Sequence, residues 1–255
     1  MCIRDRTREA LADDRTQGTD IASIPELRRY SHLVSQVKLS LDNGGQVFED
    51  VALSRGPAGR LYQQGVHGYQ NIPRDERKHH LLIDGRPTTE WDYDALHFNL
   101  LLNRCGYPCV RDVYSTVLRR LGIRKTTARR DAIKKPCLIS LNIPTVRGFC
   151  CYVGRLPEYQ EHLKHLVKRS SLIYEALVTS YPQLKSYVCT GKHGAALQRQ
   201  DGAIMDEVLE TLAQRGIVAL PEHDSVICPR EHQETVRQVM VQVYQRRTGF
   251  MVGVK

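Results

Sequence analysis

The spacing of apolar residues predicts helices and short strands along most of the chain. Residues 24–42 place apolar side chains at helical spacing and are followed by Asn43-Gly44-Gly45, so we expect one helix that ends there. Residues 54–80 are polar and contain Gly and Pro throughout. That composition predicts an extended loop region before the next element.

Two strands joined by a turn are expected after this loop. Residues 80–83 and 88–93 are the predicted strands, and Asp84-Gly85-Arg86-Pro87 has the composition of a turn. Residues 95–103 then fit a helix that starts directly after the second strand. Asp92 therefore lies at the end of a predicted strand, just before a helix.

The second half of the chain is mostly helical in pattern and contains another hairpin. Its predicted helices cover 109–142, 157–180, 197–216 and 231–246. Short apolar strands at 217–220 and 226–228 flank a turn that contains His223-Asp224-Ser225. A second acid, Asp224, is thus expected at the bend of a hairpin.

The order of these elements suits chemistry with two metal ions. Asp92 and Asp224 are far apart in sequence, but carboxylates in such positions can meet on neighbouring strands of one sheet. There they could hold two ions about 3.5–4 Å apart. The simpler alternative for Asp92 is an acid that caps the following helix, which is a common use of such a residue.

Net charge favours an anionic partner. The 255 residues include 37 Lys and Arg against 28 Asp and Glu, which gives a formal charge of +9. Nucleic acid is the commonest anionic partner of basic proteins. The length allows one large domain or two small ones.

Cysteine spacing and hydropathy point to a protein of the cytoplasm. The eight cysteines lack the paired Cys-x-x-Cys spacing of zinc sites, so we expect reduced thiols. No apolar run approaches the roughly 20 residues of a membrane helix, so no membrane partner is expected. The first residues, MCIRDR, resemble translated sequencing adapter, and we expect residues 1–54 to be a helical segment with a truncated start.

The stretch from Gly59 to Leu102 resembles the family A DNA polymerases, the group of bacterial DNA polymerase I. It contains a Gly-Arg pair, the segment Gln70-Asn71-Ile72-Pro73, and a strand that ends in Asp92-Tyr93. The resemblance implies that Asp92 binds both magnesium ions. It also implies that the backbone beside Asp92, at Tyr93, contacts the incoming triphosphate. Tyr93 matches the family tyrosine, Asp94 replaces a serine, and His97 replaces a glutamate that screens the sugar 2′ position.

The segment His223-Asp224-Ser225 resembles the second acidic motif of that family. The resemblance makes Asp224 the other metal ligand and places His223 near nucleic acid. Family A DNA polymerases usually have Glu after this Asp, whereas single-subunit RNA polymerases of phage type often have Ser. An HD-type phosphohydrolase is the competing metal-binding class, but the other histidines do not supply a convincing ligand set.

A third resemblance lies between the two acids. Arg130 and Lys134 have the Arg-x-x-x-Lys spacing of the family's fingers helix, and residues four apart share one face of a helix. The resemblance implies that both bind the nucleotide triphosphate and that Lys134 protonates the pyrophosphate, with Lys135 as its rival. Pro136 is expected to interrupt the helix. Leu138 stands where an aromatic residue usually stacks on the base, and a solvated basic helix face is the alternative.

Weaker correspondences extend to residues that would contact the primer–template. They are Arg60, Gln70, Asn71 and Gln198. Each could equally be structural.

Together these observations predict an α/β fold of the α+β type, a polymerase palm with a small antiparallel sheet flanked by helices. The palm would comprise 55–102 and 151–255, and 103–150 would form a basic, helical fingers insertion. The expected activity is a DNA-directed DNA polymerase that uses two Mg²⁺, or Mn²⁺, a primed DNA template and nucleoside triphosphates. An accessory protein would supply the missing thumb or processivity.

Two other readings stay open. Ser225 and His97 suit a single-subunit RNA polymerase or primase. Pro136 and Leu138 suit a degenerate protein that binds nucleic acid without catalysis.

Overall fold

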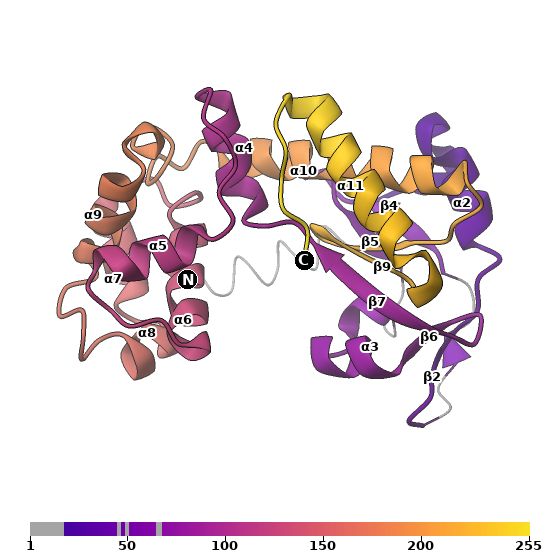
Figure 1. The fold of residues 1–255 in the computed structure, drawn as a ribbon, viewed down its shortest axis with the longest axis horizontal. Helices are drawn as coiled ribbons and strands as arrows, with labels where there is room; N and C mark the ends of the chain where they lie inside the picture. The colour runs from indigo at the N-terminus through magenta and orange to yellow at the C-terminus, as the bar shows by residue number, and fades with distance from the viewer. Residues whose placement is uncertain (1–17, 45–46, 49–50, 65–67) are drawn as a thin grey trace. The chain divides into compact units, whose positions relative to one another are not determined.

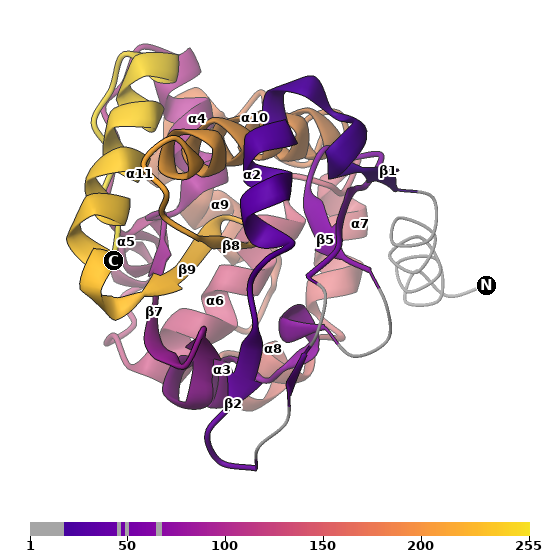
Figure 2. The same cartoon turned by 90° about the vertical axis from the view of Figure 1, so that its right-hand side faces the viewer.

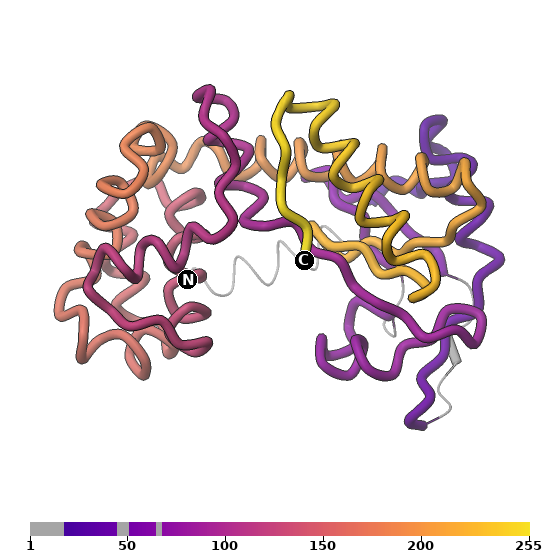
Figure 3. Tube along the Cα trace, viewed as in Figure 1, coloured from indigo at the N-terminus to yellow at the C-terminus, as the bar shows by residue number. Residues whose placement is uncertain are grey.

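A computed structural model describes residues 18–44, 47–48, 51–64 and 68–255. It divides into two compact units. Unit 1 comprises residues 1–93 and 198–255, and unit 2 comprises residues 94–197. The trace in Figure 3 shows the chain leaving unit 1 at the end of a strand and returning to it within a long helix. The predicted boundaries at 102/103 and 150/151 both fall inside unit 2.

Unit 1 is built on an antiparallel sheet (Figure 1). In spatial order its strands are β3 (Val47–Phe48), β2 (Leu39–Leu41), β6 (Leu81–Ile83), β7 (Arg86–Asp92), β9 (Ser225–Pro229) and β8 (Leu220–Glu222). The α+β fold class predicted from the sequence is confirmed. Asp84 and Gly85 both have positive φ, 50° and 72°. These are the values that a two-residue hairpin loop requires between β6 and β7.

The two faces of this sheet differ in what covers them. The Tyr93 hydroxyl donates to the carbonyl of Met240, 2.8 Å away, on α11 (Gln233–Thr248). Side chains alternate along a strand, so Glu90 and Asp92 point to the opposite face. There Arg77 of α3 (Arg74–His80) reaches Glu90. Figure 1 shows α11 and α3 on opposite sides of β7.

The rest of unit 1 packs around a second, smaller sheet. Its elements are β1 (Thr19–Asp20), β4 (Leu53–Arg55) and β5 (Leu61–Gln63), with the short helices η1 (Ile21–Ser23), η2 (Pro25–Leu27), η3 (Tyr69–Asn71) and η5 (Arg230–His232). Figure 2 shows α2 (Arg28–Val34) beside α10 (Gly194–Ala213). A Cβ on Gly202 would collide with the Gly59 carbonyl, so the loop before β5 can lie against α10 only because residue 202 is glycine.

Unit 2 is helical among its described residues. Its helices are α4 (Leu96–Arg104), α5 (Val113–Arg120), α6 (Thr127–Ile139), α7 (Val146–Val153), α8 (Pro157–His162), α9 (Ser171–Ser180), η4 (Pro182–Leu184) and the start of α10. Side chains of Asp112, Thr126 and Thr145 accept backbone hydrogen bonds at the starts of α5, α6 and α7. These caps explain why the helices begin where they do.

Several predicted elements were wrong in their extent. The strand expected over 217–220 is β8, which spans Leu220–Glu222. The helix expected over 24–42 ends at Val34, because Leu39 and Leu41 alternate on strand β2 instead. The helix expected over 157–180 is divided into α8 and α9. The loop expected over 54–80 contains β5 and α3.

Pro136 does not interrupt α6, contrary to expectation. The helix continues to Ile139, and the Ser140 amide donates to the Pro136 carbonyl at 3.0 Å. The proline removes one amide donor, but it is buried with Ile133 and Cys137 in the core of unit 2. Packing of this apolar face offsets the missing hydrogen bond.

None of the described helices is long and apolar enough to cross a bilayer. The seven described cysteines carry free thiols.

Candidate active site

Asp92 and Asp224 lie on neighbouring strands of the larger sheet. In the antiparallel register of β7 and β9, Asp92 is opposite Ser225, and the Tyr93 amide lies 3.4 Å from the Asp224 carbonyl oxygen. Adjacent strands are about 4.8 Å apart. Both aspartates are half-buried. The backbones of two acids separated by more than half of the chain thus lie next to each other at one end of the sheet, and a metal site formed by their carboxylates stays a prediction.

The backbone of Asp92 is also paired on its other side. Its amide donates to the Lys255 carbonyl at 2.8 Å, and the Lys255 amide donates to the Asp92 carbonyl at 3.0 Å. Asp92 therefore faces Ser225 as a non-hydrogen-bonded pair, the arrangement in which opposite side chains come closest. The backbone hydrogen bonds of Asp92 itself go to Lys255, and the amide of the next residue, Tyr93, bonds to Asp224.

The hairpin bend beside Asp224 presents one exposed side chain. His223 has a positive φ of 56°, is exposed, and sets its ring edge-on to Tyr62 at 6.2 Å between centroids. Arg60 lies near this bend but is bound elsewhere. Its Nη2 is 2.5 Å from Asp201, whose side chain is fully buried.

Electrostatics keep Arg60 charged. Burial disfavours its guanidinium, but Asp201 and, more weakly, Asp224 outweigh that effect and raise the pKa of Arg60. Arg60 therefore places a fixed positive charge in the field of Asp224. A contact with the primer–template stays a prediction.

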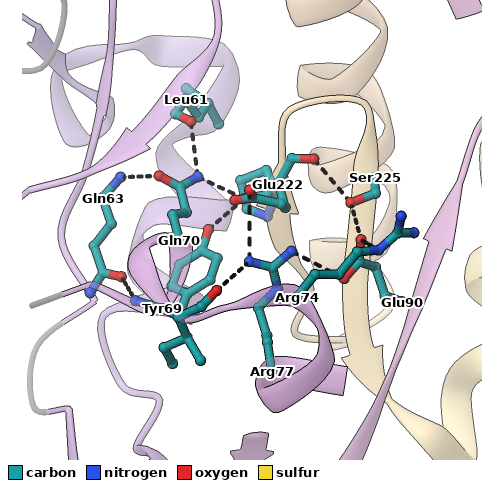
Figure 4. A network of polar contacts seen from close by, with 11 residues as sticks. Leu61, Gln63, Tyr69, Gln70, Arg74, Arg77, Glu90, Glu222 and Ser225 are labelled. Atoms are coloured by element: carbon teal, nitrogen blue, oxygen red, sulfur yellow. Dashed lines mark hydrogen bonds and ion pairs between the residues drawn. The ribbon is translucent and has the colours of Figure 1, made fainter. Parts of the chain in front are cut away.

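The segment around Gln70 packs against the β8–β9 hairpin and hydrogen-bonds to it (Figure 4). The Gln70 amide donates to the carbonyls of Leu61 and Pro221, at 3.2 and 2.9 Å, and accepts from the Gln63 amide. The Tyr69 hydroxyl donates to the same Pro221 carbonyl at 2.6 Å. Both amide donors of Gln70 are used in this way. The structure gives Gln70 a structural role, and its contact with nucleic acid stays a prediction.

A buried polar chain beneath the site was not predicted from the sequence. Arg77 lies between Glu90 and Glu222, with nitrogen–oxygen distances of 3.3 and 3.7 Å, and Ser225 binds Glu90 at 3.0 Å (Figure 4). One signal could have revealed it. Glu90 is two residues before Asp92 in one strand, so the two side chains must share a face.

The remaining predicted contacts of unit 1 differ in exposure. Tyr93 is in the core, with its ring centroid 5.8 Å from that of Tyr244. Its side chain is therefore buried away from the surface, and a backbone contact with the nucleotide stays a prediction. Asn71 is exposed, and Gln198 is half-buried on α10.

Unit 2 contains five of the six residues predicted to bind the nucleotide, and four of these five are on α6. Arg130 binds Asp112 at 3.0 Å and lies 5.3 Å from the Tyr114 ring centroid, so its guanidinium serves the packing of unit 2. Lys135 binds Glu158 at 2.8 Å. In the part of the chain that the structure describes, Lys134 has no salt bridge, which makes it the more available cation. Leu138 on α6 and His97 on α4 are half-buried.

The sequence has no recognised relative in two comparisons. No protein-family model matches it, and a search of curated proteins finds no match. The resemblance to family A polymerases therefore rests on the ordered motifs of the sequence and stays a prediction.

Proposed function

We propose that unit 1 carries a nucleotidyl-transfer site that adds deoxyribonucleotides to the 3′ end of a primer on a DNA template. The observation that supports this best is the pairing of β7 with β9, in which Asp92 lies opposite Ser225, the residue that follows Asp224. The motifs of the family also occur in the required order. The reduced thiols and the need for nucleoside triphosphates suit a reaction in the cytoplasm.

The donor set fits Mg²⁺ or Mn²⁺. Among the described residues, no group of three or more His, Cys, Asp or Glu side chains could hold a metal ion. Mg²⁺ is commonly bound by one or two carboxylates together with phosphates of the substrate. Asp92 and Asp224 would supply those carboxylates. When bound, two ions would activate the primer hydroxyl and stabilise the charge on the leaving pyrophosphate.

The side chains of the chain would orient and neutralise the reactants. Asp92, which lies opposite Ser225 and whose backbone hydrogen bonds go to Lys255, would set the position of the reacting centre. In unit 2, Lys134 forms no salt bridge with a described residue, and it is the cation to which the resemblance assigns the triphosphate. Basic side chains of unit 2 would bind backbone phosphates.

Primer extension with Mg²⁺ tests the proposal. Deoxyribonucleotides and ribonucleotides are offered separately, and we expect extension with the former. Asp92→Ala and Asp224→Ala should abolish extension while the thermal unfolding midpoint stays close to that of the parent chain. Asp75→Ala, which removes an exposed acid of α3, should retain activity. Extension by either active-site variant would refute the assignment, and a preference for ribonucleotides would make the enzyme an RNA polymerase or primase.

Metal binding can be measured without turnover. Trp91 is the only tryptophan in the chain and precedes Asp92 directly. Tb³⁺ bound at the two aspartates should emit when Trp91 is excited, and Mg²⁺ should compete for the site. Loss of this signal in Asp92→Ala, with retention in Asp75→Ala, is the expected result.

A second function is favoured by the charge of unit 2, which has 17 Lys and Arg against 6 Asp and Glu, a net +11. It is nucleic-acid binding without catalysis. DNA binding that falls with salt and needs no Mg²⁺, with no extension of either kind, would select it.

A further inference from the structure

Glu90 and Ser225 lie beside the two aspartates and are bound to each other. Glu90 shares a face of β7 with Asp92, and Ser225 is the next residue after Asp224. The Ser225 Oγ lies 3.0 Å from Glu90 Oε1. This bond connects the strand that ends in Asp92 with the hairpin that carries Asp224.

The Ser225 hydroxyl has a choice of two acceptors. It lies 3.0 Å from the Glu222 carbonyl as well as from Glu90, and a hydroxyl has a single proton. The carboxylate is the stronger acceptor because it is charged. Only 4% of Ser225 is exposed, so water does not replace these partners easily.

Glu90 is held in turn by a buried arginine (Figure 4). Arg77 is 5% exposed and the Glu90 side chain 8%, and Arg77 also reaches Glu222 at 3.7 Å. The guanidinium therefore joins carboxylates from β7 and β8, the two neighbours of β9. Arg74 reaches Glu90 at 3.6 Å from an exposed position.

Stability alone does not account for this arrangement. A buried ion pair is often no more stabilising than apolar side chains of similar size. A buried network of directional bonds, by contrast, restricts the geometry of its members, because they accept few alternative positions. In this sheet the geometry so restricted is that of Asp224 relative to Asp92.

We propose that the Arg77–Glu90–Ser225 chain positions the hairpin of Asp224 against the strand of Asp92 and thereby sets the affinity of the site for divalent cations. This inference rests on the proposed function. All three are positioning residues, because each acts on the metal through the aspartates. Groups that orient metal ligands typically contribute about 10- to 100-fold in affinity.

Ser225→Ala is the primary test, with Thr88→Val as its matched control. Thr88 is on the same strand and face as Glu90, is also 4% exposed, and donates a buried hydroxyl bond to the Leu81 carbonyl. Tb³⁺ titration through Trp91, with Mg²⁺ competition, is run on full chains at a temperature where circular dichroism shows both variants folded. We expect Ser225→Ala to weaken binding about 10-fold. Thr88→Val should match the parent chain.

Two further variants test the chain of contacts. Ser225→Thr keeps the hydroxyl and should restore the parent affinity. Glu90→Gln should weaken Tb³⁺ binding as Ser225→Ala does. The double variant should bind Tb³⁺ no more weakly than whichever single variant has the lower affinity, because both changes remove the same contact.

The outcomes separate this inference from the proposed function. Parent-like affinity in a folded Ser225→Ala variant, or an equal loss in Thr88→Val, would overturn the positioning role alone. Absence of Asp92-dependent Tb³⁺ binding in the parent chain would overturn the metal site and this inference together.

Discussion

The two units differ in net charge and in how many of their cationic side chains form ion pairs. Unit 1 has 20 Lys and Arg against 22 Asp and Glu, a net −2, whereas unit 2 has a net +11. In unit 1 the arginines at 55, 60 and 77 are bound to carboxylates in partly or wholly buried pairs. Most cations of unit 2 have no such partner among the described residues. Charge in unit 1 organises the fold, and charge in unit 2 is available for an anion.

Removing a buried cation from unit 1 should have the largest effect on stability. Arg77→Met would leave Glu90 and Glu222 without their shared guanidinium, which should cost about 3–5 kcal/mol. Arg74→Met is the control, since Arg74 reaches the same Glu90 from a 62% exposed position and should cost less than about 1 kcal/mol. Urea unfolding measures both. Equal effects would mean that Arg77 does not hold the network.

Removing exposed cations from unit 2 should change binding and leave stability unaltered. Arg119, Arg120 and Arg124 are exposed and form no salt bridge with a described residue. Replacing all three by Gln should lower the slope of log affinity against log salt by about 2–3, the release expected for three phosphate contacts. Fluorescence anisotropy with labelled DNA across a range of NaCl concentrations gives the slope.

The matched control for this change is in unit 1. Arg28, Lys38 and Arg215 are also exposed and without a salt bridge to described residues. Their triple replacement by Gln should leave the salt slope close to that of the parent chain. If both triple variants lower the slope equally, the contrast between the units does not extend to nucleic-acid binding.

Acidification should act in opposite directions on one aspartate of each unit. Burial raises the pKa of Asp206 in unit 1 to about 6, and the pair with Arg55 only partly offsets it. The folded chain therefore binds the proton of the Asp206 carboxyl more tightly than the unfolded chain does. The free energy of unfolding thus falls as pH rises from about 4 to about 6. In unit 2, burial opposes the charge of Asp112, but hydrogen bonds from Ser115 and Arg130 hold its pKa well below the usual range. Its contribution is present above about pH 4 and is lost below it.

Unfolding of Asp206→Asn and Asp112→Asn across this pH range measures both effects, which should be the smallest of the set. As pH falls from 6 to 4, the free energy of unfolding of the parent chain should rise relative to that of Asp206→Asn by on the order of 1 kcal/mol. The parent chain should be more stable to unfolding than Asp112→Asn at neutral pH, and this difference in free energy should become smaller below about pH 4. A pH-independent difference in either case would contradict the assigned environment.

The sequence by itself determined the elements whose signals are local. The turn at Asp84-Gly85 follows from residues that tolerate positive φ, and the β8–β9 hairpin from short apolar runs around a polar turn. Asp92 and Asp224 were singled out by the resemblance to the family A polymerases, together with their predicted places at a strand end and at a hairpin bend. The fold class was correct because helices and antiparallel hairpins each have a characteristic period.

Only the tertiary structure decided which polar side chains form hydrogen bonds and ion pairs within the fold. Gln70 and Arg60 occur in motif-like positions, yet the side-chain amide of Gln70 donates to the Pro221 carbonyl, and Arg60 forms an ion pair with the fully buried Asp201. The alternation of the strand puts Glu90 on the face of Asp92, but nothing in the sequence marks Ser225 as its partner, because their contact joins residues 135 apart in the chain. Pairings of this kind depend on strand register and burial, which no local pattern encodes. The sequence therefore located the acids, and the sheet decided what surrounds them.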